Sequence, residues 1–137
     1  MNTKSWLQRA WGIEDEINTL LATKEIIKQS LLSTTAKLDG DPVQSTKDPH
    51  KYDRLAIIID TIDGLIDKRY DTENEIIQAI GRLEKPLYRR IMILRYIDRM
   101  TFPLIAEEVN MSQRHVERLH GMALIEMGGI LNGQYRS

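Results

Sequence analysis

Two long stretches of this chain place apolar residues at alternating spacings of four and three, the heptad pattern of packed amphipathic helices. The first stretch runs from about Thr3 to Leu32 and the second from Pro49 to about Leu83. The first seam is Trp6, Ala10, Ile13, Ile17, Leu20, Lys24, Ile27 and Leu31. The second is Leu55, Ile58, Ile62, Leu65, Thr72, Ile76, Ala79 and Leu83. We therefore expect an all-α protein that opens with a long antiparallel helical hairpin over residues 1–84.

The segment between the two stretches, residues 33–48, contains Gly40, Pro42 and many small polar residues, which predicts a loop. Asp48 and Pro49 then form a helix start, with Asp as the N-cap and Pro at the first helical position. The second helix also carries a second apolar flank, formed by Ile59, Ile66, Ile77 and Ile80. A helix that is apolar on two flanks needs more than one partner, so we expect a homodimer through the hairpin.

Composition excludes several classes of function. The chain has no cysteine, which rules out disulfides, thiolate zinc sites and cysteine nucleophiles. No apolar run has the length of a membrane span, and no signal peptide is recognisable, so we expect a soluble, intracellular protein. Residues 1–84 hold eleven basic and fifteen acidic side chains, whereas residues 85–120 hold seven basic and four acidic ones. A basic segment on an acidic chain is typical of an attached nucleic-acid-binding module.

The C-terminal third has the capping residues of three further helices. Pro86 opens a helix that reaches about Ile97, and Thr101 is the expected N-cap of a short helix, Phe102–Val109. Asn110 and Met111 form a tight turn, and Ser112 caps a last helix that should end near Met127, before Gly128 and Gly129. Two helices joined by such a turn predict a helix-turn-helix domain over residues 85–128, followed by a tail at 129–137.

In the last helix, the residues expected to pack inside the domain lie on one side, and the residues expected to contact base edges lie on the opposite side. Taking Val116 as zero, Leu119 and Ala123 lie at about 300° and 340°, and Arg114 and Arg118 at about 160° and 200°. Gln113 and His115 flank the arginines. Arginine pairs with guanine, glutamine with adenine, and Glu117 can accept a hydrogen bond from a cytosine amine. For His115 and His120 a metal role is disfavoured by their spacing, so a surface or base-contact role is expected.

The stretch LYRRIMILRYIDRMTFPLIAEEVNMSQRHVERLHGMALIEM resembles region 4 of bacterial sigma-70 factors. It is more similar still to the sigma-region-4-like late transcription regulators of phages from Gram-positive bacteria, the ArpU/RinA type. The resemblance implies that Gln113, Arg114, His115 and Arg118 read bases, with Thr101 and Ser112 near phosphates. It also implies double-stranded DNA and host RNA polymerase as partners, in the cytoplasm of the host bacterium. Leu104 and Gln113 depart from the sigma pattern, so the sigma sequence preference is not carried over.

Three other functions are compatible with the sequence. Asp60, Asp63, Asp67 and Asp71 form one carboxylate stripe, as in helical Mg²⁺-dependent nucleotide hydrolases, but the stripe lies opposite the predicted seam, where water would solvate it. We therefore expect no catalytic residue, no cofactor and no metal site. A small-terminase-like DNA-packaging protein and an adaptor that binds RNA polymerase without reading DNA are the remaining alternatives. Oligomeric state separates a packaging protein from a regulator, because a ring of eight or more subunits favours packaging and a dimer favours a regulator.

Overall fold

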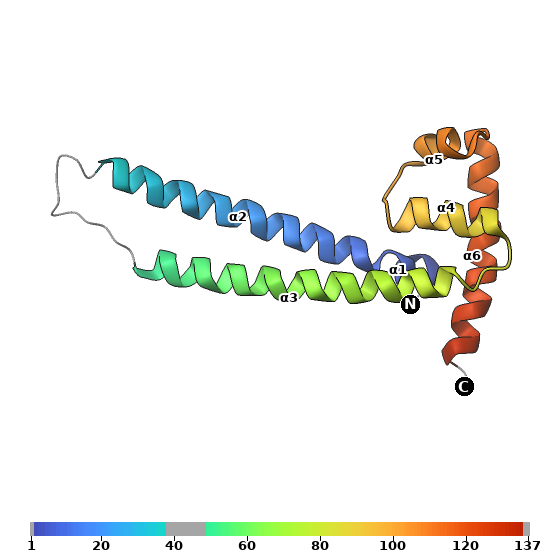
Figure 1. Ribbon diagram of the computed structural model, residues 1–137, viewed down its shortest axis with the longest axis horizontal. Helices are drawn as coiled ribbons and strands as arrows, with labels where there is room; N and C mark the ends of the chain where they lie inside the picture. Colours follow the sequence, from blue (N-terminus) through green and yellow to red (C-terminus); the bar gives the residue numbers. More distant parts are fainter. Residues whose placement is uncertain (1, 38–48, 136–137) are drawn as a thin grey trace. The chain divides into compact units, whose positions relative to one another are not determined.

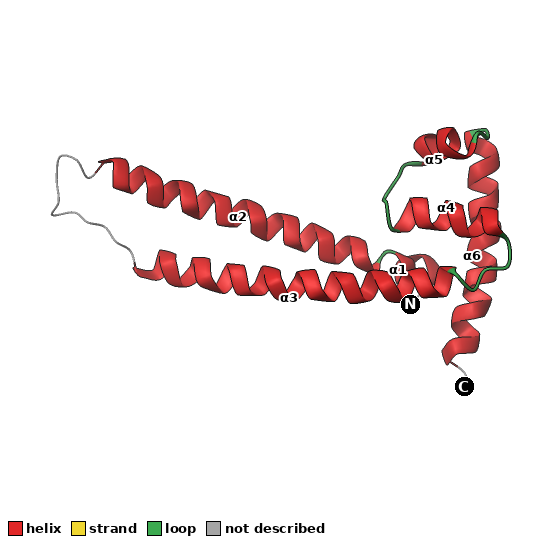
Figure 2. Ribbon diagram, in the orientation of Figure 1, coloured by secondary structure: helices red, strands yellow, loops and turns green. Residues whose placement is uncertain are grey.

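The computed structural model describes residues 2–37 and 49–135, which form six α-helices and no strand (Figures 1 and 2). In chain order they are α1 (Thr3–Leu7), α2 (Arg9–Lys37), α3 (Pro49–Ile80), α4 (Pro86–Tyr96), α5 (Phe102–Val109) and α6 (Gln113–Tyr135). The predicted all-α class is confirmed for this part of the chain. None of these described helices is long and apolar enough to cross a membrane.

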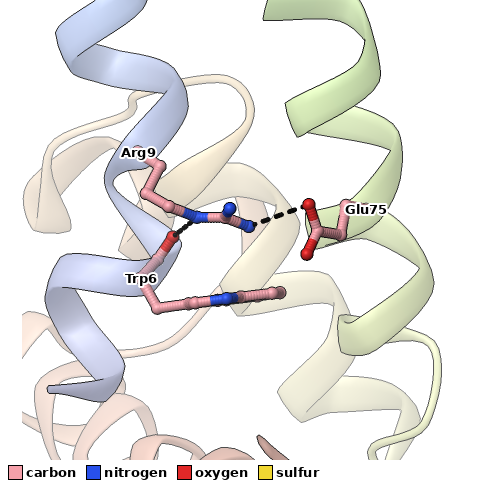
Figure 3. Close-up of polar contacts among 3 residues, drawn as sticks. All are labelled: Trp6, Arg9 and Glu75. Carbon is pink, nitrogen blue, oxygen red and sulfur yellow. Dashed lines mark hydrogen bonds and ion pairs between the residues drawn. The ribbon is translucent and has the colours of Figure 1, made fainter. Parts of the chain in front are cut away.

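The first helix was predicted as one continuous element, and this prediction is wrong. Asn2 caps α1, its side chain accepting a hydrogen bond from the Ser5 amide at 2.7 Å, and the helix is interrupted at Gln8. The side chain of Arg9 then donates from Nε to the carbonyl oxygen of Trp6 at 3.0 Å (Figure 3). The Trp6 carbonyl oxygen therefore keeps a hydrogen-bond partner although the helix is broken at Gln8.

The end of α2 also differs from the prediction. The helix continues to Lys37, so the first residues of the predicted loop, 33–37, are helical. These positions hold neither glycine nor proline, and the first such residues are Gly40 and Pro42, so nothing local stops the helix earlier. The remainder of the predicted loop, and the Asp48 cap, lie outside the described residues. α3 begins at Pro49 as predicted but ends at Ile80, one residue before Gly81.

Residues 13–68 form one of two compact units. Within it, α2 and α3 run antiparallel (Figure 1) and pack through Ile13, Ile17, Ile58 and Ile62. Leu20, Ile27 and Leu65 are partly buried against these four residues, and all seven belong to the predicted seams. We refer to this unit as the α2–α3 pair. Farther along it, Lys51 Nζ donates to Ser30 Oγ at 2.7 Å, which fixes the register of the two helices.

The second unit combines residues 1–12 with residues 69–137. Its larger core draws on the first two helices, the end of α3, and both α4 and α6; its buried members are Trp6, Leu7, Ala10, Ile76, Ala79, Ile80, Leu83, Tyr88, Met92, Tyr96, Ala123, Met127 and Leu131. The predicted division of the chain after residue 84 therefore falls inside one compact unit.

The end of α3 is tied to the α1–α2 corner by a charged contact as well. Arg9 Nη2 pairs with Glu75 Oε2 at 3.2 Å, and its guanidinium lies 4.4 Å from the centre of the Trp6 ring (Figure 3). Trp6 itself is buried, so the guanidinium covers one face of a core aromatic residue while its charge is neutralised at the surface.

The last helix does not end at Gly128 and Gly129, as predicted, but runs through both to Tyr135. Neither glycine has a positive φ, which a helix-ending glycine would need. Met127 and Leu131 are buried in the larger core and Ile130 packs against it, so burial of this last turn favours continuation of the helix. The predicted tail is therefore helical from residue 129 to Tyr135.

Candidate nucleic-acid interface

The helices α5 and α6 are joined by a turn whose three special positions follow from their side chains. Thr101 caps α5, its hydroxyl accepting from the Leu104 amide at 3.5 Å. Asn110 adopts the left-handed conformation, with φ 57° and ψ 48°, which asparagine tolerates better than most residues. Ser112 Oγ accepts from the His115 amide at 3.1 Å, which caps α6. All three roles match the prediction from the sequence.

A small apolar core holds this pair of helices against α4. Its buried residues are Ile91, Ile105, Ala106, Val109 and Val116, with Leu119 and Met111 among the partly buried residues around them. α6 lies across both α4 and α5 (Figure 1). Because Val116 is fully buried, the first turns of α6 have a fixed rotation about their axis, which decides which side chains face solvent.

The opposite side of those turns is exposed. Ser112, Gln113, Arg114, Glu117 and Arg118 are all solvent-exposed, and His115 is half-buried. Ser112, Arg114, His115 and Arg118 line an open hollow on the surface. The structure thus brings together six of the seven predicted DNA-binding residues within two turns of one helix start. The seventh, Thr101, is exposed at the start of α5.

Two contacts divide this face into a basic and an amide–carboxylate side. Arg118 Nη2 lies 3.0 Å from His115 Nδ1. A guanidinium can only donate, so His115 Nδ1 is the acceptor in this contact. On the other side, Gln113 Nε2 donates to Glu117 Oε1 at 3.2 Å. Each contact joins two side chains on successive turns of α6.

Most of the other basic residues between positions 85 and 120 serve the fold. Arg89 Nη1 donates to the carbonyl oxygens of Leu83 at 2.6 Å and Glu84 at 3.0 Å. Arg90 Nη2 donates to the Glu108 carbonyl at 3.1 Å, near the end of α5. These arginines satisfy carbonyl groups that no helix pairs. The positive charge of this segment, which the sequence suggested was for DNA, is therefore partly structural.

Arg95 and Arg99 are likewise engaged within the chain. Arg95 Nη1 donates to the Met100 carbonyl at 2.9 Å, and its guanidinium lies 4.5 Å from the Phe102 ring centre. The Arg99 guanidinium lies 4.9 Å from the ring centre of Trp11. Arg114 and Arg118 are the arginines of this segment that lie on the exposed face of α6.

His120 does not have the surface or base-contact role that was expected for it. It is only 7% exposed, and its Nε2 lies 2.7 Å from the hydroxyl oxygen of Tyr96 in a hydrogen bond. Burial, aided by the charges of Arg95 and Lys4, lowers the pKa of His120 to about 4, and burial raises the pKa of Tyr96 to about 12. The helical spacing already contained this signal, because His120 lies about 40° from Val116, on the packed side of α6.

The carboxylate stripe of α3 has no metal-site geometry. Asp60, Asp63, Asp67 and Asp71 are all exposed. Among the described residues there is no group of three or more histidine, cysteine, aspartate or glutamate side chains that could hold a metal ion. The stripe is thus a solvated helix face in this part of the chain.

Comparisons of the chain with protein-family models, with curated proteins and with solved structures find no match.

Proposed function

We propose that the protein is a sequence-specific DNA-binding transcription regulator, and that α5, the turn at Asn110 and α6 act as its helix-turn-helix. In this proposal the first turns of α6 lie in the major groove of double-stranded DNA. The regulated genes are late genes of a phage, and the protein acts in the cytoplasm of the host bacterium, with host RNA polymerase as a further partner. These last features rest on the resemblance of residues 87–127 to the sigma-region-4-like late transcription regulators of phages.

The observation that carries the proposal is the exposed face of α6. Arg114 and Arg118 point away from Val116, which is buried, and they stand next to the capped N-terminus of the helix. Exposed backbone amides at that end attract phosphate, and arginine reads the edge of guanine with two hydrogen bonds. The Arg118–His115 contact further supports a base-reading role, since it holds the guanidinium at a defined position.

The proposal includes a second copy of the chain, associated through the α2–α3 pair. A single helix in one major groove makes too few contacts for tight specific binding, and regulators of this kind commonly place two reading helices on one duplex. A small-terminase-like packaging protein remains the alternative, and it predicts a ring of many subunits in place of two.

Replacing both arginines tests the proposed reading face. We expect the Arg114→Ala/Arg118→Ala variant to lose about 1–3 kcal/mol of binding free energy for each guanine contact, because each loss removes a bidentate hydrogen bond. The binding site is first located by mapping the phage DNA that the wild-type protein occupies. Affinity for that site and for random DNA is then measured by fluorescence anisotropy at several salt concentrations.

The matched control is Arg54→Ala/Lys68→Ala, which removes the same charge from exposed positions of α3. We expect this variant to keep its preference for the specific site. Equal affinities of the wild type and the α6 variant, for both specific and random DNA, would contradict the proposed face. If both variants lost the same binding free energy, α6 would contribute to DNA binding only through its positive charge and not through contacts with bases.

A further inference from the structure

The α2–α3 pair leaves a row of large apolar side chains outside its own seam. These side chains are between 40% and 61% exposed, and they are Leu21, Leu32, Tyr52, Ile59 and Ile66. We call them the apolar row. All five belong to the same compact unit, so their arrangement depends only on the packing of α2 against α3.

Helix geometry places the members of the apolar row on one face of the pair. On α3, Tyr52, Ile59 and Ile66 lie about 80–120° around the axis from the buried Ile58, and on α2, Leu21 and Leu32 lie about 80–100° from the buried Ile13. The rotation has the same sense on both helices. In an antiparallel pair with facing seams, equal rotations of the same sense bring both sets to the same side.

The register of the helices sets where the members of this row lie along the pair. Because Lys51 bonds to Ser30, Tyr52 and Leu32 lie near the same end of the pair. Toward the other end of the pair, Ile59 on α3 lies close to the level of Leu21 on α2. Ile66 lies one heptad beyond Ile59 on α3. On α3 the row therefore repeats every seven residues, at 52, 59 and 66, which is the repeat of a helix–helix contact.

The opposite face of the pair lacks such a row. Its α2 positions include Thr19, Thr23 and Ser30, and its α3 positions include Arg54, Thr61 and Lys68. Ile26 and Ile57 are its large apolar residues, 69% and 63% exposed, and they stand among these polar side chains. On α3 the two faces therefore differ in composition, whereas on α2 the face of the apolar row also carries Glu25 and Lys28.

The area of the apolar row fits a partner of the same kind. The five side chains expose roughly 450 Å² together, close to the apolar share of the roughly 800 Å² that each subunit contributes to a standard dimer interface. A patch of this size is as large as the largest apolar patch of a typical monomer, and such patches are often functional. A two-fold interface also needs only one patch, which both copies supply.

We propose that two copies of the chain associate through the apolar row, so that two α2–α3 pairs form a four-helix bundle. This inference rests on the dimer in the proposed function and names the surface that makes it. The contact between α2 and α3 within each pair is unchanged. The apolar rows of the two copies pack against each other and form a second apolar contact, between the pairs. The exposed Ile57 and Ile26 stay outside the bundle.

The test is the mass of the full chain in solution, without DNA, measured by analytical ultracentrifugation at about 1–100 μM. We expect a dimer whose dissociation constant rises at least about a hundredfold in Ile59→Glu/Ile66→Glu, since four carboxylates, two from each copy, would be buried in the contact. The matched control, Ile57→Glu/Ile26→Glu, changes residues that are more exposed but lie on the other face, and it should remain dimeric. Circular dichroism checks that each variant keeps its helical content.

A second measurement does not depend on disruptive variants. Because the chain has no cysteine, a single Ile59→Cys variant can be treated with a short bifunctional thiol reagent. It should give a covalent dimer at dilute concentration, whereas Ile57→Cys should not. A monomeric wild type, a dimer that survives the Ile59/Ile66 change, a large ring, or equal cross-linking at both positions would each overturn the proposal. None of these results depends on Arg114 or Arg118, so DNA reading is judged separately.

Discussion

The buried contact between His120 and Tyr96 joins α6 to α4 by a polar bond inside an apolar core. The two rings stack with centres 5.6 Å apart, and the Trp11 ring stacks on Tyr96 at the same distance. Trp11 Nε1 also donates to the Tyr96 carbonyl at 2.8 Å. The neutral form of His120 fits this site, because an added charge would meet an apolar surrounding and the nearby Arg95.

This site makes stability depend on pH. The pKa of His120 is about 4 in the folded protein against an ordinary 6.5, so the unfolded chain binds the proton more readily. The stabilisation is therefore complete above about pH 6.5 and is lost as pH falls toward 4, by about 2–3 kcal/mol. Urea unfolding at several pH values should show this loss.

The control for the titration is His120→Gln, which cannot change charge. Its free energy of unfolding should be lower than that of the wild type at pH 7, because the polar contact with Tyr96 is altered, but it should fall less between pH 6.5 and 4. The same slope in both proteins would show that other groups produce the acid sensitivity.

At the level of helices, the starts were easier to predict than the ends. Pro49, Pro86, Thr101 and Ser112 mark starts that agree with the structure, because a cap or a proline acts on the adjacent turn. The ends of α2 and α6 were predicted wrongly. Gly128 is a stop signal only if it takes a positive φ, and the burial of Met127 and Leu131 keeps the chain helical instead.

Gly128 and Gly129, which are adjacent in α6, predict opposite degrees of tolerance. An alanine Cβ at Gly129 would meet open space, so Gly129→Ala should raise the free energy of unfolding by about 0.5–1 kcal/mol through helix propensity. At Gly128 the same atom would lie 3.1 Å from Thr3 Oγ1, where α1 approaches α6, so Gly128→Ala should gain less or destabilise. Chemical unfolding of both variants measures the difference. An equal gain in the free energy of unfolding would show that the Thr3 side chain moves aside without cost.

At the scale of the whole molecule, the apolar pattern predicted the helical class and the seam of the α2–α3 pair, and it predicted which side chains of α6 are exposed opposite Val116. It did not predict that Trp6 and Leu7 lie in one core with Met92 and Met127, because spacing along a helix does not say which distant helix it packs against. Nor did charge counting separate Arg89 and Arg90, which hold backbone carbonyls, from Arg114 and Arg118.

The shared core predicts a strong effect of a substitution far along the chain from α6. Trp6 is 4% exposed and contacts the core that contains Met127, so Trp6→Ala should lower the free energy of unfolding by about 3–5 kcal/mol. Ile125→Ala, at a side chain that is 79% exposed, should change it by less than about 0.5 kcal/mol. Thermal and urea unfolding both report these values. A small effect at Trp6 would mean that residues 1–12 are dispensable for the unit.

The packing of α1 against α6 also limits how the molecule can be dissected. A recombinant piece beginning at Lys85 would contain every residue proposed to touch DNA, yet it would lack Trp6, Leu7, Ile76, Ala79, Ile80 and Leu83, the side chains that fill one side of its interior. Such a piece would have an open apolar flank and too little core to stay folded. In the proposed function, loss of DNA binding on removal of residues 1–12 would therefore report loss of the core that supports α6, not contacts made by those residues.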